Sequence, residues 1–473
     1  MTTWHGNPEH IHDVLGIGFG PSNLALAIAV QERTARTPGD PFRALFLERQ
    51  AGFGWHRGML IDDATMQVSF LKDLVTLRDP TSDFSFLAYL HERGRLVDFL
   101  NQKSLFPLRI EFHDYFEWAA SRLAHLVEYS AEVVSVRPVT ADGEVRWFDV
   151  VSRDPAGPGC TTVRRTRGIC VATGLEPHLP PGTVLSERVW HNSELLPRVG
   201  ELRRSGAPVR RAVVLGAGQS AAEAVDYLHR SFPDAEICSV FAKYGYTPAD
   251  DSPFANRIFD PEAVDVYFGA PADVKRSLFD YHRSTNYSVV DMDLIQSLSR
   301  TMYQEKVRGR RRLRMMNVSR IREVGTHPGG VRMAVEFLPT GEREVLEADL
   351  LVHATGYRPR GLGEDLGEVG KLCLRDEEDA LRVGRDHRVE TAPNVTAAVY
   401  LQGGTEHTHG LASTLLSTTA IRAGEICGAL FARRGVSVPG TGFAAGPRRR
   451  PPGPQPPPRD GGGGAAGGGE PPT

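Results

Sequence analysis

Residues 13–27 read DVLGIGFGPSNLALA, and this stretch decides the fold. A short apolar run is followed by Gly16, Gly18 and Gly20, then by Pro21 and a helix rich in alanine and leucine. The pattern predicts a strand, a tight turn and a helix, which is how a dinucleotide-binding fold begins. The glycines let backbone N–H groups approach a pyrophosphate at the positive end of the helix. Pro21 replaces the usual third glycine and suits the first helical turn, where its missing N–H costs nothing.

The composition bounds the possible functions. The chain has 473 residues, enough for two or three domains. Its 55 basic and 58 acidic residues give a net charge of −3, so we expect no nucleic-acid and no membrane partner. The five cysteines contain no C-x-x-C, and His407 and His409 lack a carboxylate or cysteine cluster, so no metal site is expected. Without a signal pattern or a long apolar run, we expect a soluble, cytoplasmic protein that acts on a small molecule.

A strand with an acidic end follows the first helix. Residues 42–48 read FRALFLE and finish at Glu48. In a dinucleotide fold, an acid at the end of the second strand bonds the adenosine ribose hydroxyls. An acid at a strand end is common by itself, and the glycine turn upstream is what favours this role for Glu48. Residues 168–174 form a further strand that ends in Ala-Thr-Gly, the usual end of the first segment of a flavin domain.

The opening theme returns in residues 211–223, RAVVLGAGQSAAE, with Gly216 and Gly218 in the turn. The following strand ends near Lys243 rather than at an acid, which favours NADPH over NADH because a base tolerates the 2′-phosphate. A second Ala-Thr-Gly at residues 354–356 indicates that the chain returns to the first domain. We therefore expect an α/β fold with two Rossmann-like domains, the NADPH domain being inserted in the FAD domain.

The expected boundaries follow from these motifs. Residues 10–205 form the first part of the FAD domain and residues 206–345 the NADPH domain, which contains a helical substrate-binding segment at about residues 245–312. Residues 346–434 return to the FAD domain and the substrate site. Residues 435–473 form a tail rich in proline and glycine that cannot bury a core and is expected to be disordered.

Three polar residues in loops are open to two interpretations. Lys72 lies in residues 66–82, where polar groups alternate irregularly with aromatic ones, as in loops that line a site. A solvated surface lysine is the more frequent alternative. Asn256 and Asn286 lie in turn-rich stretches between helices, where asparagines commonly cap helices or fix turns.

Four strings of the sequence, taken in order, resemble one enzyme family. They are FLKDLVTLRDPTS at residues 70–82, SPFAN at 252–256, TNYS at 285–288 and HGL at 409–411. Together they resemble the L-ornithine N(5)- and L-lysine N(6)-monooxygenases, the N-hydroxylating flavoproteins of siderophore biosynthesis. The resemblance extends over roughly residues 10–434.

The resemblance implies roles for individual residues. In this family the lysine matching Lys72 binds the substrate carboxylate, and the asparagines matching Asn256 and Asn286 hold the amino-acid end. Phe259 and Ser417 are the other implied substrate contacts. The implied FAD contacts are Gly16, Gly18, Gly20, Pro21, Ser22, Glu48, Trp55, His56, Gln67, Val133, Thr414, Leu415 and Leu416. The implied NADP contacts are Gly216, Gly218, Gln219, Ser220, Lys243, Asn286, Tyr287 and Ser288.

The resemblance also implies a reaction. NADPH reduces FAD, O₂ adds to give a flavin 4a-hydroperoxide, and the neutral side-chain amine of the substrate attacks its distal oxygen. No side chain acts as a nucleophile, because the cofactor carries the chemistry while the protein excludes water. A homo-oligomer is expected, since tetramers are usual in this family.

Three functions remain open at this point. Residues 66–70 and 76–79 are more similar to the L-ornithine branch, so we expect N(5)-hydroxy-L-ornithine as the product. L-lysine is the alternative substrate, since one methylene is worth only about 1–3 kcal/mol of discrimination. A non-catalytic flavin or NADPH sensor is the alternative from another functional class.

Overall fold

The computed structural model describes residues 2–3, 11–39, 41–157, 159–360 and 366–435. The expected tail, residues 435–473, lies outside these ranges except for its first residue. Met1–Leu430 form one compact unit. Within the described ranges, no helix is long and apolar enough to cross a membrane.

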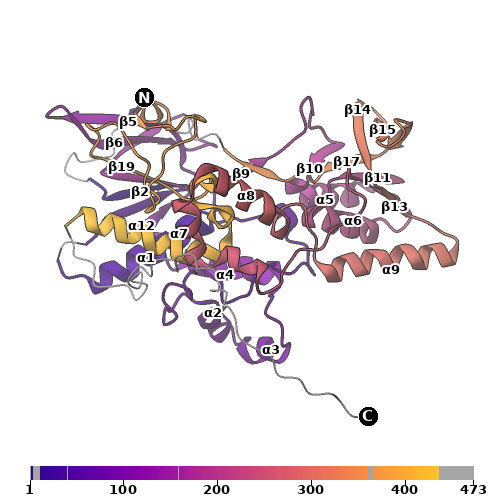
Figure 1. The fold of residues 1–473 in the computed structure, drawn as a ribbon, viewed down its shortest axis with the longest axis horizontal. Helices are drawn as coiled ribbons and strands as arrows, with labels where there is room; N and C mark the ends of the chain where they lie inside the picture. Colours follow the sequence, from indigo (N-terminus) through magenta and orange to yellow (C-terminus); the bar gives the residue numbers. More distant parts are fainter. Residues whose placement is uncertain (1, 4–10, 40, 158, 361–365, 436–473) are drawn as a thin grey trace, which may run out of the picture. The chain divides into compact units, whose positions relative to one another are not determined.

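The first parallel sheet contains the opening glycine turn (Figure 1). Its strands, in spatial order, are β19 (Ala398–Leu401), β8 (Gly168–Val171), β2 (Val14–Ile17), β3 (Ala44–Leu47) and β4 (Val127–Glu128). Helix α1 (Pro21–Arg36) packs beside β3 and α4 (Arg109–Ser121). An antiparallel sheet of β5 (Glu132–Ala141), β6 (Glu144–Arg153) and β7 (Thr161–Thr166) covers the other face, because Phe148 and Val150 share one core with Leu15 and Ile169.

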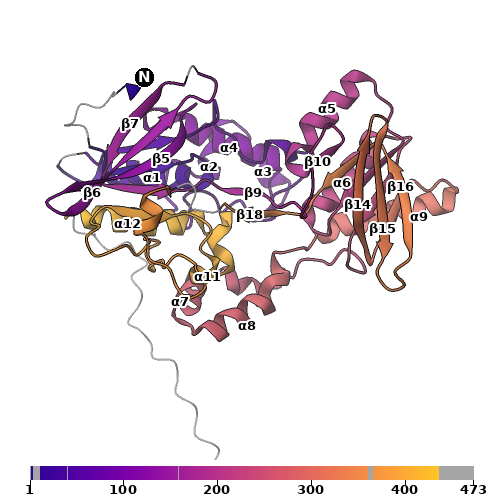
Figure 2. The ribbon, with the colours of Figure 1, turned by 90° about the horizontal axis from the view of Figure 1, so that it is seen from above.

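The second sheet repeats this architecture. Its parallel strands, in spatial order, are β10 (Val189–His191), β17 (Leu350–His353), β11 (Arg211–Leu215), β12 (Glu236–Val240) and β13 (Leu313–Met316). Two hydrophobic cores pack against this sheet. The helices that contribute to one of them are α5 (Leu195–Ser205), α6 (Gln219–Ser231) and α9 (Met292–Arg308). An antiparallel sheet contributes to the other core. Its strands are β14 (Ser319–His327), β15 (Gly330–Phe337) and β16 (Arg343–Ala348) (Figure 2). The expected α/β fold with two dinucleotide-binding sheets is confirmed.

The chain crosses from the first sheet to the second and back. The two crossings pair as an antiparallel ribbon of β9 (Leu175–Pro177) and β18 (Tyr357–Pro359). Strands β10 and β17 both belong to the second sheet. This sheet therefore uses residues on both sides of the expected range 206–345. At residue 346 the physical reason is that each Ala-Thr-Gly ends a strand beside a glycine turn, and both sheets contain such a strand; at residue 205, β10 and α5 precede the second glycine turn but pack with its sheet. The tripeptide therefore marks a turn and does not identify the sheet.

The expected helical segment lies between β12 and β13. It contains η4 (Ala255–Phe259), α7 (Pro261–Gly269), α8 (Ala272–His282), η5 (Arg283–Thr285) and α9. Helix α7 lies against α11 (Glu406–His409), which follows the last strand of the first sheet (Figure 2). Helix α9 differs from the others because Leu298 places it in the core of the second sheet.

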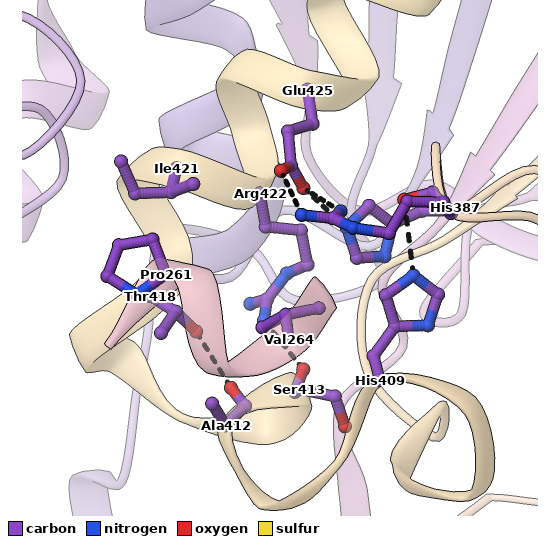
Figure 3. Close-up of a pocket in the computed structure, with 11 residues that line it drawn as sticks. Pro261, Val264, His387, His409, Ala412, Ser413, Thr418, Ile421, Arg422 and Glu425 are labelled. Atoms are coloured by element: carbon purple, nitrogen blue, oxygen red, sulfur yellow. Dashed lines mark hydrogen bonds and ion pairs between the residues drawn. The ribbon is translucent and has the colours of Figure 1, made fainter. Parts of the chain in front are cut away.

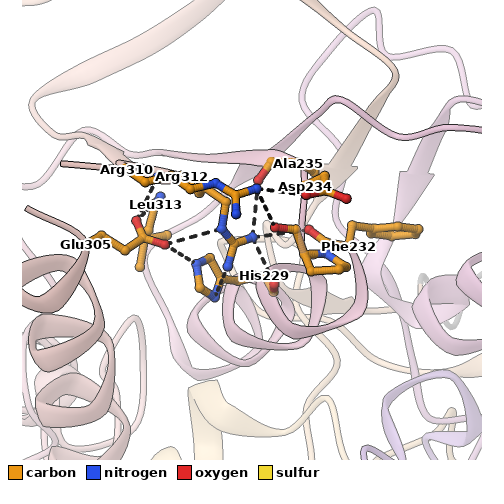
Figure 4. A network of polar contacts seen from close by, with 9 residues as sticks. His229, Phe232, Asp234, Ala235, Glu305, Arg310, Arg312 and Leu313 are labelled. Atoms are coloured by element: carbon orange, nitrogen blue, oxygen red, sulfur yellow. Dashed lines mark hydrogen bonds and ion pairs between the residues drawn. The ribbon is translucent and has the colours of Figure 1, made fainter. Parts of the chain in front are cut away.

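A polar network ends helix α6 (Figure 4). The Arg312 guanidinium donates to the carbonyl oxygens of His229, Phe232 and Ala235. Glu305 of α9 accepts the backbone N–H of Arg312 at 2.7 Å and hydrogen-bonds His229 at 2.7 Å. Arg312 thereby satisfies the His229 carbonyl in the last turn of α6 and two carbonyls of the residues that follow, which anchors the end of the helix that begins at the second glycine turn.

One buried ion pair joins α4 to α6, and its loss is a test of the fold. Arg109 donates to both carboxylate oxygens of Glu223, at 2.6 and 2.9 Å, and the two side chains are only 12% and 7% exposed. Arg109→Met leaves a buried carboxylate without its cation, so urea unfolding should show a loss of about 3–5 kcal/mol. The control is Arg314→Met, which breaks an exposed two-bond pair with Glu344 and should cost about 1 kcal/mol or less. Equal losses in the two variants would contradict this assignment.

Candidate active site

The first glycine turn joins β2 to α1. Gly18 has a φ of +84°, and a Cβ there would lie 2.5 Å from the carbonyl oxygen of Ala172, so only glycine fits. Gly20 is the N-cap of α1, has no side-chain cap, and would place a Cβ within 4 Å of nothing. The first N–H groups of α1 are therefore accessible to a diphosphate, which their partial positive charge attracts. This geometry fits the FAD pyrophosphate predicted at this turn.

Glu48 lies beside the same turn, directly after β3. One carboxylate oxygen accepts the backbone N–H of Phe19 at 2.8 Å, and the other accepts that of Gln50 at 2.9 Å. The side chain is buried, and these two bonds fix its orientation. The position is the one that a ribose-binding acid requires, and the contact with FAD itself stays a prediction.

The second glycine turn has the same construction. Gly216 has a φ of +150°, and a Cβ there would lie 2.2 Å from the carbonyl oxygen of Ala354. Gly218 is the N-cap of α6, again without a side-chain cap, and a Cβ there would lie 3.4 Å from the Cα of Ser288. The Lys243 ammonium donates to the Ser288 carbonyl oxygen at 2.7 Å. The loop that contains Asn286 is therefore held against the second turn.

Asp291 links residues assigned to the two cofactors. Its backbone N–H donates to the side-chain oxygen of Gln219 at 2.8 Å, and its carboxylate accepts from the Gln67 amide at 3.3 Å. Gln67 is a predicted FAD contact and Gln219 a predicted NADP contact, so the structure brings the two predicted sites together. The sequence reasoning missed Asp291, although its position as the N-cap of α9 was readable from the sequence.

Asp73 holds the loop that contains Lys72. Its buried carboxylate accepts the backbone N–H groups of Val75, Thr76 and Phe86 at 2.9, 2.6 and 2.8 Å. Burial raises the pKa of Asp73, and these hydrogen bonds to the charged form oppose the rise. The half-buried Lys72 side chain has no hydrogen bond or ion pair within the described ranges. The ammonium is therefore presented on a rigid turn, and Asp73 is a residue that sequence reasoning missed.

The other predicted substrate residues lie on the helical segment. Asn256 and Phe259 are in η4, which packs against η7 (Leu411–Thr414). The Asn256 amide donates to the carbonyl oxygen of Asp251 at 2.8 Å, a loop-fixing contact. In the part of the chain that the structure describes, no hydrogen bond joins the side chains of Lys72, Asn256 and Asn286 to one another, so they are not a preformed network.

Glu406 connects the Asn286 loop to the predicted flavin loop. Its carboxylate accepts from the Tyr287 hydroxyl and, at 3.2 Å, from the Thr414 hydroxyl. Burial, followed by the hydrogen bond to Glu406, raises the pKa of Tyr287, so the phenol stays protonated. Glu406 is a second residue that sequence reasoning missed. Nearby Ser417 is buried, and its hydroxyl has no hydrogen-bond partner among the described residues.

The other predicted FAD residues include Trp55, His56 and Val133. Trp55 packs edge-on against His56, with 4.7 Å between ring centroids. His56 has a φ of +47°, and burial, with a smaller effect of Arg109, lowers the pKa of His56 to about 4. Its imidazole is therefore neutral at pH 7. Val133 lies in β5 and packs against the core of the first sheet.

The two histidines considered as metal ligands have other partners. His407 hydrogen-bonds the carbonyl oxygen of Leu381 at 2.8 Å, and His409 hydrogen-bonds that of Arg385 at 3.3 Å. Over the described ranges, no group of three or more His, Cys, Asp or Glu side chains could hold a metal ion.

Comparison with known proteins identifies relatives of this chain. Residues 10–359 match the L-lysine 6-monooxygenase/L-ornithine 5-monooxygenase family. The L-ornithine N(5)-monooxygenase of Pseudomonas aeruginosa is 39% identical over 425 residues, which is 89% of this chain and 94% of that protein. The enzyme of the same name from Burkholderia cepacia is 41% identical over 414 residues, 85% of this chain and 90% of that protein.

Solved structures agree with the sequence relatives. The ornithine N-hydroxylase of Kutzneria sp. 744, solved with reduced FAD, NADP⁺ and L-ornithine, has a TM-score of 0.85 at 45% identity and covers 90% of this chain and 100% of its own. The L-lysine 6-monooxygenase of Pseudomonas syringae has a TM-score of 0.77 at 30% identity, with 89% and 99% covered. The resemblance inferred from the sequence is confirmed, and the chain belongs to the L-lysine 6-monooxygenase/L-ornithine 5-monooxygenase family.

Proposed function

We propose that this protein uses FAD and NADPH to hydroxylate the side-chain amine of L-ornithine with O₂, giving N(5)-hydroxy-L-ornithine for siderophore biosynthesis. The observation that carries this proposal is the loop around Asn286. It lies against the second glycine turn at Gly218 and is joined to Thr414 of the predicted flavin loop through Tyr287 and Glu406. These contacts support a role for this loop in binding both a nicotinamide cofactor and a substrate beside the flavin.

The cofactors fit the residues present. FAD would bind with its pyrophosphate at Gly18–Ser22 and a ribose at Glu48, and NADPH with its pyrophosphate at Gly218–Ser220. Burial, followed by the charge of nearby Arg283, lowers the pKa of Lys243. Lys243 follows the second nucleotide strand and Arg283 of η5 is a neighbouring cation; together they suit a 2′-phosphate, which favours NADPH.

The substrate would be held at its amino-acid end. Lys72 offers a cation for the carboxylate, while the amides of Asn256 and Asn286 offer hydrogen bonds. The buried, unpartnered hydroxyl of Ser417 offers a further contact near the predicted flavin loop. Bound FAD supplies the redox and oxygen chemistry, and this chain's residues bind the amino acid, orient its neutral amine and exclude water.

L-Ornithine is favoured over L-lysine by the relatives. The ornithine enzymes named above are 39–45% identical to this chain, whereas the L-lysine 6-monooxygenase of Pseudomonas syringae is 30% identical. L-Lysine N(6)-hydroxylation is the second candidate because the same anchor groups would accept either amino acid.

A product assay separates these functions. With purified protein, FAD and NADPH, hydroxylamine formation should be at least about tenfold faster with L-ornithine than with L-lysine at equal concentration, as one methylene allows. Preferential hydroxylation of L-lysine would replace the proposed substrate. Tight NADPH binding with no amine-dependent product would instead identify a sensor and contradict the enzyme.

Lys72→Ala tests the carboxylate anchor. Removing a charge-assisted contact to the substrate should raise the KM for L-ornithine by about 30-fold or more, which corresponds to about 2 kcal/mol. The rate of flavin reduction by NADPH should change little, since Lys72 is not expected to touch either cofactor. The matched control is Lys306→Ala on the exposed face of α9. An unchanged KM in Lys72→Ala would make Lys72 an ordinary surface lysine.

Gly20→Ala tests the FAD cradle without disturbing the fold. The φ of Gly20 is −81° and an added Cβ meets no protein atom within 4 Å, so the apoprotein should keep its Tm. A methyl group at the end of α1 would obstruct the diphosphate, and the Kd for FAD should rise about tenfold or more. Gly200→Ala in α5, which also meets no atom, is the control and should leave FAD affinity unchanged. Equal FAD affinity in both variants would place the diphosphate elsewhere.

A further inference from the structure

The HGL string has no assigned role so far, and the structure shows where it lies. A cavity of about 20 Å³ is bounded by α7, by the loop before β19, by the HGL string and by α12 (Thr419–Arg433) (Figure 3). Its lining residues include Pro261 and Val264 of α7, Arg385 and His387 of the loop, His409, and Glu425 of α12. The helical segment thus meets the first domain at this cavity.

Arg385 is the ionic link across this contact. It donates to both carboxylate oxygens of Glu425 at 2.7 and 2.9 Å, and its Nε donates to Asp265 of α7 at 2.6 Å. Burial alone would lower the pKa of Arg385, but the bonds to Glu425 and then Asp265 raise it above the ordinary value. Burial opposes ionisation of Glu425, yet His387 and Arg385 lower the pKa of Glu425 to about 2. The guanidinium therefore stays charged between two carboxylates.

The His409 ring and the Gly410 backbone lie beside this link and form a platform against which α7 packs. The His409 ring stacks on His387, with centroids 4.1 Å apart and planes 21° apart. The other contacts are with α7: Phe268 lies 5.4 Å from the His409 ring, and a Cβ on Gly410 would lie 3.1 Å from the Tyr267 ring. With its φ of +75°, Gly410 is required both by the backbone and by this close approach.

The face of α7 matches this platform. Phe268 is four residues after Val264 and three after Asp265, so it neighbours both on the surface of the helix. Helix α7 follows η4 after a single residue, Asp260, and η4 contains Asn256. The position of Asn256 relative to the loop at Thr414–Ser417 therefore depends on how α7 is seated, together with the direct packing of η4 against η7.

We propose that Arg385 is a positioning residue for the substrate amine: with Glu425 and the His409–Gly410 platform, it fixes the distance from Asn256 to the flavin loop. The inference rests on the proposed function, because this distance matters only if the amino-acid end binds at Asn256. Ornithine and lysine differ by one methylene. If α7 is held less firmly, the side-chain amine should be placed less accurately at the flavin, and the enzyme should discriminate less between the two amino acids.

Asp265→Asn, Arg385→Gln and the double variant test the link in the FAD-loaded protein. The KM for L-ornithine should rise about threefold in Asp265→Asn and about tenfold in Arg385→Gln. Hydroxylated product per NADPH oxidised should fall, and the preference for ornithine over lysine should narrow. The double variant should be no worse than Arg385→Gln, because both substitutions remove the same link. FAD content and the rate of flavin reduction should stay unchanged.

The control is Arg382→Gln, which breaks an exposed pair with Glu390 at 2.7 Å near the same loop. Asp265 is 62% exposed, so its variant folds even where Arg385→Gln does not. Wild-type KM, product ratio and preference in Asp265→Asn would overturn the inference. A parallel loss of Tm, FAD content and flavin reduction, with the product ratio intact, would also overturn it. If the wild-type protein hydroxylates neither amino acid, the proposed function itself fails.

Discussion

Each nucleotide site depends on one close approach of backbone to backbone. Gly18 lies against the carbonyl of Ala172, and Gly216 lies against that of Ala354, at distances that exclude any Cβ. This contact seats each turn on the end of the neighbouring strand and directs the N-terminus of α1 or α6 out of the sheet. The position of each glycine cradle follows from it. The Ala-Thr-Gly tripeptides are the partners of the glycine turns.

Two dinucleotide sites can exchange electrons only if contacts between the two domains fix their relative positions. The Arg109–Glu223 pair joins a helix of the first domain to the helix of the second glycine turn. Asp291 connects Gln67 to Gln219, whose amide also donates to Glu223 at 3.0 Å. Gln219 and Glu223 lie in the N-terminal half of α6, the helix that follows the second glycine turn. The helical segment between β12 and β13 is also held by contacts to the first domain.

Local patterns predicted the cradles, because a strand, a glycine turn and a helix are consecutive in sequence. The same locality made Glu48 and Lys243 readable. Glu406 and Asp291 were not predictable in this way, since Glu406 meets Tyr287 and Asp291 meets Gln67 only after distant segments fold together. The boundary at residue 346 was misplaced for a related reason. The Ala-Thr-Gly that follows β17 is a local pattern that occurs at the end of a strand in either sheet. The predicted substrate residues came from family resemblance, and the structure adds Asp73, which fixes the turn that contains Lys72.

The central claim is that one site between the two cradles binds L-ornithine with its carboxylate at Lys72 and its amine toward residues 414–417. A crystal structure of the protein with FAD, NADP⁺ and L-ornithine tests it most directly. The predicted result is a carboxylate within hydrogen-bonding distance of the Lys72 ammonium, amides of Asn256 and Asn286 at the amino-acid end, and the side-chain amine at the flavin. An amino acid bound in the reverse direction, or bound away from Lys72, would contradict it.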